Sequence, residues 1–100
     1  AFNAPVILFF FMDSFLQKGS YMDCGMFIQS IMLSAVEHGL ATCPQAALGE
    51  YPDIVREELS YAEDKLLLCG MALGYEDKSE IVNSYRTPRK DLDKMVRYFS

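Results

Sequence analysis

One stretch, residues 21–38, constrains the fold most strongly, because its apolar side chains surround a helix instead of lining one side of it. Ser20 and Asp23 form a predicted capping pair at its start, and Gly39 follows its predicted end. The apolar positions, which cover nearly the whole circumference, are Tyr21, Met22, Cys24, Met26, Phe27, Ile28, Ile31, Met32, Leu33, Ala35 and Val36. Such a helix must be buried on all sides. A chain this short can hardly surround it, so we expect part of its surface to meet a second subunit or a segment outside the sequence, with core filling as the alternative.

Length and composition place the sequence among single globular domains. Its 100 residues are 51% hydrophobic and 23% charged, which excludes disorder and leaves no room for a second domain. The longest apolar run, residues 6–12, falls short of the roughly 20 residues of a membrane-spanning helix. No basic side chain precedes it, as a signal peptide would require, and the first residue is not Met. We therefore expect one domain over residues 1–100, no membrane contact, and upstream residues removed by processing or lying outside the sequence.

Positive charge is concentrated at the C-terminal end of the sequence. The net charge is -5, yet residues 86–100 hold five basic and two acidic side chains, whereas residues 1–85 hold four basic and twelve acidic ones. The negative total argues against nucleic-acid binding, which requires a basic face. For the basic tail two interpretations stay open, a solvated helix face and a phosphate site built on nearby arginines.

The cysteines and the single histidine predict neither a catalytic nor a metal site. Cys24, Cys43 and Cys69 are odd in number, widely spaced and without a CxxC pair, so we expect free, buried thiols in a reducing cytoplasm. His38 lies where the long helix should end, and we interpret it as structural. With one histidine and no GxSxG motif, a hydrolase with an activated nucleophile is disfavoured.

Apolar runs and helical spacing predict a small domain with helices on both faces of a sheet. The predicted elements are strands at residues 5–12, 40–43 and 65–75, a loop of small residues at 44–49, and helices at 21–38, 52–59 and 88–99. The first and last strands are continuous apolar runs, which are typical of central strands covered on both faces. Pro52 and Pro88 occupy the first positions of the two shorter helices.

Two segments offer chemistry on physical grounds. Within residues 39–49 the predicted strand ends at Pro44 and small residues follow. Backbone N–H groups there can approach a flat ligand without obstruction by side chains. Residues 84–90 place Arg86 and Arg89 at the start of a predicted helix, whose N-terminal amides also favour anions. Each signal is weak when taken alone.

Taken together and in order, these segments resemble the C-terminal half of the FMN-dependent nitroreductase family. The likeness covers practically the whole chain and is carried by APVILFFF, YMDCGMFIQSIMLSAVEHGLATCPQAAL, YPDIVREEL and LLLCGMALGYEDKSEIVNSYRTPRKDL. The pattern GLxTCPQ, followed by CGMxLGY, VN and an Arg-containing tail, is similar to the nitroaromatic and nitrobenzoate reductase branch. The resemblance implies an α+β fold: an α/β/α layered sandwich with a small mixed or antiparallel sheet around a long buried helix. It also implies that the family's N-terminal half is not among residues 1–100.

The resemblance implies a role for particular residues. In the family the loop after GLxTC lies against the flavin and offers main-chain contacts near N5, which here fall on Pro44, Gln45, Ala46 and Ala47. An arginine of the family's tail binds the FMN phosphate, a role that the resemblance gives to Arg89, with Arg86 as the second candidate. No catalytic side chain and no metal are implied.

The implied activity is that of an NAD(P)H oxidoreductase, cytoplasmic and homodimeric, whose FMN passes a hydride to a nitroaromatic or quinone acceptor. The alternative is a non-catalytic dimeric interaction domain that keeps the family core without binding flavin, and an unrelated α/β domain is the third interpretation. If the long helix forms the dimer interface, a charge at Ile31 or Met32 should lower subunit association or abolish folding.

Overall fold

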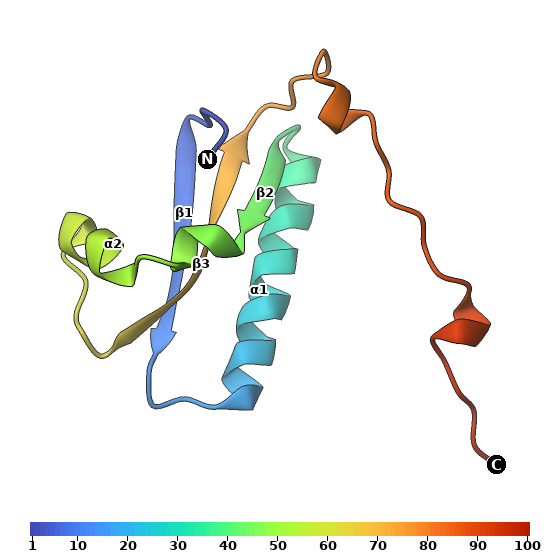
Figure 1. The fold of residues 1–100 in the computed structure, drawn as a ribbon, viewed down its shortest axis with the longest axis horizontal. Coiled ribbons are helices and arrows are strands. Elements are labelled where there is room, and N and C mark those ends of the chain that lie inside the picture. Colours follow the sequence, from blue (N-terminus) through green and yellow to red (C-terminus); the bar gives the residue numbers. More distant parts are fainter.

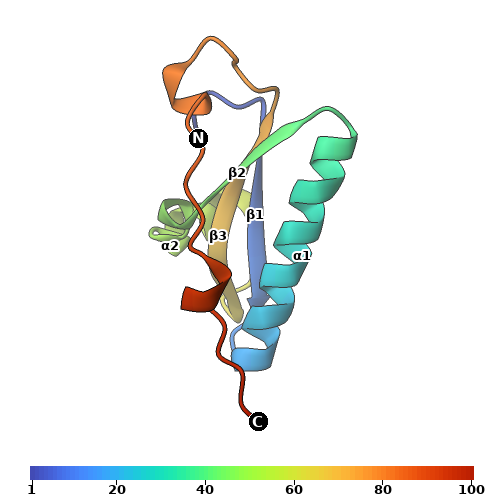
Figure 2. The same cartoon turned by 90° about the vertical axis from the view of Figure 1, so that its right-hand side faces the viewer.

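The computed structural model describes residues 1–100 as a three-stranded sheet with one long helix on one face and a short helix on the other (Figures 1 and 2). In chain order the elements are strand β1 (Val6–Asp13), helix α1 (Lys18–Glu37), strand β2 (Ala41–Gln45), the 3-10 turn η1 (Ala46–Gly49), helix α2 (Pro52–Leu59), strand β3 (Lys65–Gly74), and the 3-10 turns η2 (Ile81–Asn83) and η3 (Leu92–Lys94). The predicted α/β/α layering is therefore confirmed, and the sheet is antiparallel.

The sheet has the order β1-β3-β2, so that β3 is its central strand. This position confirms the prediction for residues 65–75, whereas the prediction that residues 5–12 form a central strand is wrong, because β1 pairs only with β3. The apolar run of β1 nevertheless packs on both faces. Phe10 meets Phe27 of α1 edge-on at 6.3 Å between ring centroids, and Phe11 stacks on Tyr61 after α2 at 4.0 Å.

Helix α1 begins three residues earlier than predicted. Its N-cap is Gln17, which makes no side-chain cap, so the predicted capping pair of Ser20 and Asp23 is wrong. The other end agrees with the prediction: His38 is the C-cap, its Nδ1 donates to the Ser34 carbonyl oxygen at 2.8 Å, and Gly39 follows in the left-handed region at φ 72°. No helix of the chain, α1 included, is long and apolar enough to cross a membrane.

Helix α1 packs only one of its sides on the chain itself. The apolar positions that are buried or half-buried recur at helical spacing and are Cys24, Ile28, Ile31, Met32 and Ala35. The opposite side carries a second apolar stripe that stays exposed, formed by Met22, Met26, Leu33 and Val36. We call these four residues the outer stripe. One chain therefore does not bury this helix on all sides. The shortness of the chain predicted this outcome.

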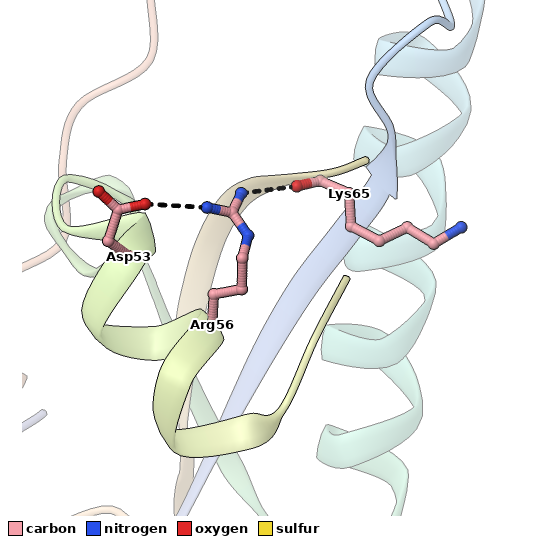
Figure 3. A network of polar contacts seen from close by, with 3 residues as sticks. All are labelled: Asp53, Arg56 and Lys65. Carbon is pink, nitrogen blue, oxygen red and sulfur yellow. Dashed lines mark hydrogen bonds and ion pairs between the residues drawn. The ribbon is translucent and has the colours of Figure 1, made fainter. Parts of the chain in front are cut away.

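Arg56 ties α2 to the beginning of β3. Its guanidinium donates to Oδ1 of Asp53 at 3.0 Å and to the carbonyl oxygen of Lys65 at 2.9 Å (Figure 3). The side chain of Lys65 in turn forms an ion pair with Asp13, its register partner at the end of β1. This chain of contacts fixes α2 against the sheet and so holds the segment that joins β2 to α2.

The C-terminal segment leaves the body of the molecule after β3 (Figure 1). Its hydrogen bonds are local, and residues 84–100 are all exposed. The radius of gyration is 16.6 Å, larger than the roughly 13 Å typical of a compact domain of this size. The predicted helix over residues 88–99 is wrong, because only the single turn η3 forms there.

Candidate functional site

The turn η1 lies directly on β3, and two glycines make this close approach possible. A Cβ on Gly70 would lie 2.6 Å from Cδ1 and 2.8 Å from Cβ of Leu48, and a Cβ on Gly49 would lie 2.8 Å from the Leu68 carbonyl oxygen. Leu48 therefore occupies the space above Gly70, in the centre of the sheet. The predicted loop at residues 44–49 is thus a rigid corner in which β2 ends and η1 begins.

This corner presents backbone donors to solvent between small side chains. Pro44, Ala46 and Ala47 are exposed, and Gln45, the N-cap of η1, makes no side-chain cap. The first N–H groups of a 3-10 helix have no partner within the helix, so the amides of Ala46 and Ala47 are free to bind an acceptor. The four loop residues predicted from the sequence therefore lie together, on one exposed edge.

The side chain of Gln45 is the feature of this corner that sequence reasoning missed. Its Oε1 is buried and has no hydrogen-bond partner. Gln45 is the register partner of Gly70, and a Cβ built on Gly70 would point toward Leu48 of η1. Because side chains of directly paired residues lie on the same face of a sheet, the side chain of Gln45 also lies on the η1 face. Only the strand pairing, which the sequence does not display, reveals this position.

The two predicted arginines are placed elsewhere. Arg86 donates to the carbonyl oxygens of Asn83 at 2.7 Å and Tyr85 at 3.1 Å, and Arg89 donates to Oγ1 of Thr87 at 2.6 Å. Both guanidinium groups are thus turned toward their own segment, which runs well away from η1 in Figure 1. The structure brings the four loop residues together and does not bring the arginines to them.

A cavity of about 660 Å³ opens beside the other end of β2. Its walls come from the end of α1, the start of β2 and the segment after β3, and include Val36, Thr42 and Tyr75. No sequence pattern marks this cavity, because it is formed by segments that only the strand pairing brings together. It contains none of the predicted site residues.

The three cysteines are free, as predicted. Cys24 and Cys69 are half-buried, whereas Cys43 on the edge strand β2 is exposed, so its predicted burial is wrong. Burial raises the pKa of the Cys69 thiol above its ordinary value, and repulsion from Cys24 adds to the rise. Cys69 therefore stays a protonated, unreactive thiol at neutral pH.

Comparison with known proteins gives a consistent set of matches. The model of the Nitroreductase family matches residues 1–75. The chain is 43% identical over 89 residues to a 4-nitrobenzoate reductase of Pseudomonas putida, which covers 89% of this chain and 39% of that protein. It is 38% identical over 97 residues to a chloronitrobenzene nitroreductase of Comamonas testosteroni, covering 97% of this chain and 43% of that one.

Solved structures agree with these sequence matches. The FMN-dependent nitroreductase NfnB from Mycobacterium smegmatis, solved in complex with NADPH, superposes with a TM-score of 0.90 at 37% identity, covering 97% of this chain and 43% of that one. The FMN and NADPH-dependent nitroreductase NfnB from Sphigopyxis sp. strain HMH gives a TM-score of 0.94 at 39% identity, covering 99% and 44%. The chain thus spans less than half the length of each of these four relatives.

Proposed function

The chain belongs to the nitroreductase family, and we propose that it supplies part of the flavin site of an FMN-dependent NAD(P)H oxidoreductase. The observation that carries this proposal is the corner of β2 and η1, where small exposed residues leave uncapped amides at the edge of the sheet. When bound, FMN would supply hydride transfer from NAD(P)H to a nitroaromatic or quinone acceptor. The names of the relatives, nitrobenzoate and chloronitrobenzene reductases, favour nitroaromatic acceptors.

The residues of the corner fit a flat flavin ring. Main-chain N–H groups of Ala46 and Ala47 are donors that match the acceptor atoms of the ring, and methyl side chains leave its plane unobstructed. Pro44 offers a rigid apolar surface beside them. The corner is held in place by Leu48 above Gly70, so the donors are fixed before any ligand arrives, which lowers the cost of binding.

Arg86 and Arg89 would hold the phosphate of FMN. Both are exposed, and a guanidinium forms bidentate hydrogen bonds with phosphate. Because the tail that carries them extends away from its own corner, the phosphate they bind would belong to a site completed by another part of the assembly. A homodimer, in which the tail reaches the partner, provides such an assembly.

The outer stripe of α1 supports this homodimer. Its four side chains are 62% to 70% exposed, an unusual state for Met, Leu and Val on one helix face. Packing the same stripe of a second copy against it would remove these side chains from water in a symmetric interface. The three free cysteines are compatible with a reducing compartment, and we place the protein in the cytoplasm.

Binding of FMN by the purified chain and by variants at Ala46 tests the proposal. Gln45 has an extended backbone, φ -134° and ψ 109°, as a residue before proline requires, so Ala46→Pro removes one N–H without straining the turn. We expect Ala46→Pro to bind FMN about tenfold more weakly, whereas the control Ala46→Ser, which keeps the N–H, binds like the original chain. Equal binding by both variants would remove the Ala46 amide from the site.

The alternative function, a non-catalytic dimeric interaction domain, is favoured by the outer stripe, which exists independently of any flavin. It predicts a dimer that leaves the fluorescence of added FMN unchanged. The flavin proposal predicts quenching of that fluorescence by the same dimer.

A further inference from the structure

The hydroxyl of Thr87 lies in the tail between Arg86 and Arg89, and it is in contact with a positive charge. Nη1 of Arg89 donates to Oγ1 of Thr87 at 2.6 Å and to the Thr87 carbonyl oxygen at 3.1 Å. The guanidinium thus sits directly on the hydroxyl oxygen. A phosphate attached to this oxygen would be bound by the guanidinium, because arginine and phosphate form charge-assisted hydrogen bonds.

Two other hydroxyls after β3 have the opposite surroundings. Oγ of Ser79 donates to Oδ1 of Asp77 at 2.6 Å, and Oγ of Ser84 donates to the Ile81 carbonyl oxygen at 2.6 Å. A phosphate on either serine would therefore face an oxygen acceptor, which offers it no donor. The contacts of Thr87 favour a phosphate, and those of the two serines oppose one.

Thr87 is also accessible to a modifying enzyme. Residues 84–100 are all exposed, and the tail runs away from the body of the molecule in Figure 1. Pro88 follows Thr87 and restricts its backbone to extended conformations. Enzymes that modify a protein chain reach exposed segments that lack tertiary contacts.

We propose that Thr87 is a phosphorylation site and that its phosphate binds the Arg89 guanidinium, which then no longer holds the phosphate of FMN. The effect on FMN rests on the proposed function. The co-reactants are ATP and a serine/threonine protein kinase that accepts proline after the modified residue. Oγ1 of Thr87 bonds to the γ-phosphorus of ATP, the bond from this phosphorus to the bridging oxygen breaks so that ADP leaves, and the hydroxyl proton passes to the carboxylate base of the kinase.

The phosphate on Thr87 competes with FMN because it is tethered. A short flexible tether gives a group an effective concentration on the order of millimolar, and the phosphate adds about 1.5 to 2 negative charges at pH 7. Arg89 is therefore paired before FMN arrives from solution. Phosphorylation thus lowers the affinity of the chain for FMN without touching the corner of β2 and η1.

The site is tested by incubating the purified chain with MgATP and a proline-directed serine/threonine kinase, and by mapping the phosphate with tandem mass spectrometry. We expect one phosphate, on Thr87. Pro88→Ala, which keeps the hydroxyl and both arginines, should lose the modification, and Thr87→Val should carry none. An original chain that stays unmodified, or a phosphate on another residue, would overturn the assignment of the site.

The contact with Arg89 is tested by 31P NMR, which needs no flavin. A guanidinium beside the phosphate favours its dianion, so the 31P resonance should reach the dianion position at a lower pH in the phosphorylated original chain than in phosphorylated Arg89→Ala. Equal pH profiles of the two chains would show that the phosphate does not bind Arg89, and the inference would fail.

The effect on the cofactor is measured as dissociation constants for FMN and riboflavin before and after phosphorylation. We expect the phosphorylated chain to bind FMN about tenfold more weakly and riboflavin equally well, and Thr87→Val treated with the same kinase to keep its FMN affinity. Unchanged FMN affinity after phosphorylation would refute the competition. If the original chain binds no FMN, the proposed function fails, and the kinase and NMR experiments still decide whether Thr87 is modified and whether its phosphate binds Arg89.

Discussion

Gly70 determines how closely η1 lies on the sheet. A methyl group at this position would come within 2.8 Å of both Cβ and Cδ1 of Leu48, so rotation of the leucine end alone cannot relieve the clash. The whole turn has to shift, and the free amides of the corner shift with it. The glycine therefore acts on the candidate site through the position of Leu48.

We predict that Gly70→Ala lowers the free energy of unfolding by about 1 to 3 kcal/mol through overpacking. Gly25→Ala is the control: a Cβ there meets no atom within 4 Å, and alanine in a helix is favoured over glycine by about 0.5 to 1 kcal/mol. Urea denaturation of the three chains measures both effects. Equal stability of Gly70→Ala and the original chain would mean that η1 is not fixed by this contact.

Thiol reactivity separates the cysteines. Burial raises the pKa of Cys69 above 9.0, so the folded chain holds this proton more tightly than the unfolded chain does. The contribution of the protonated Cys69 thiol to the free energy of unfolding is therefore fully present below pH 9.0, and it is lost as the pH rises through the pKa of this thiol in the folded chain.

The exposed Cys43 should react first with a chromogenic disulfide reagent at about pH 8, and Cys69 should react slowly, because the thiolate is the nucleophile. In Cys43→Ser the fast phase should disappear. A fast phase that persists in this variant would assign the accessible thiol to another cysteine.

At the scale of elements, α1 is a helix with two apolar sides, and the structure corrects which residues belong to which side. Ile31 and Met32, where the sequence suggested testing the interface, are half-buried on the sheet side. A charge there would disturb the fold of one chain before it disturbed an assembly. Leu33, 63% exposed in the outer stripe, is the position that tests association alone.

We predict that Leu33→Glu produces a folded monomer, with the dissociation constant of the dimer raised about a hundredfold or more, because an interface would bury its carboxylate unpaired. Ser34→Glu places the same charge one residue along, outside the stripe, and should leave the dimer intact. Sedimentation equilibrium gives the association state, and circular dichroism confirms that both variants fold. A dimeric Leu33→Glu would show that the outer stripe is not the interface.

The elements with strong local signals were predictable, and those that depend on distant contacts were not. Residues 52–59 carry Pro52 at the first position and form α2 with the predicted bounds, and the apolar run of β3 is the central strand. β1 has an equally apolar sequence yet is an edge strand within this chain. The sequence could not predict this, because apolar side chains on both faces of a strand do not reveal how many strands pair beside it. The predicted helix over residues 88–99 has helical spacing but no surface to pack on, and short isolated helices are unstable in water.

At the scale of the whole molecule, the candidate site is divided between the corner and the tail. The corner was predictable because its residues are contiguous in the sequence. The placement of Arg86 and Arg89 was not, because the tail that carries them makes only local hydrogen bonds and extends away from the corner. The sequence motifs predict which residues share a function, but they do not predict the distance between the corner and the tail.

We predict that Arg89→Ala weakens FMN binding about tenfold to a hundredfold at low salt, since a charge-assisted hydrogen bond is lost, and that the difference shrinks at high salt. Riboflavin, which lacks the phosphate, should bind the original chain and this variant equally. Arg97→Ala is the control for tail charge, since Arg97 lies over the ring of Phe99 at 5.1 Å and outside the predicted pair. A parallel loss of riboflavin binding would assign Arg89 a role other than phosphate recognition.

The visible absorption spectrum of the purified chain, recorded with FMN before and after addition of NADPH, tests the central claim most directly. The account predicts that FMN remains with the protein through gel filtration, that its absorption band is shifted from that of free FMN, and that the band bleaches when NADPH is added without oxygen. A chain that elutes colourless and leaves the FMN spectrum unchanged at every concentration would contradict the account.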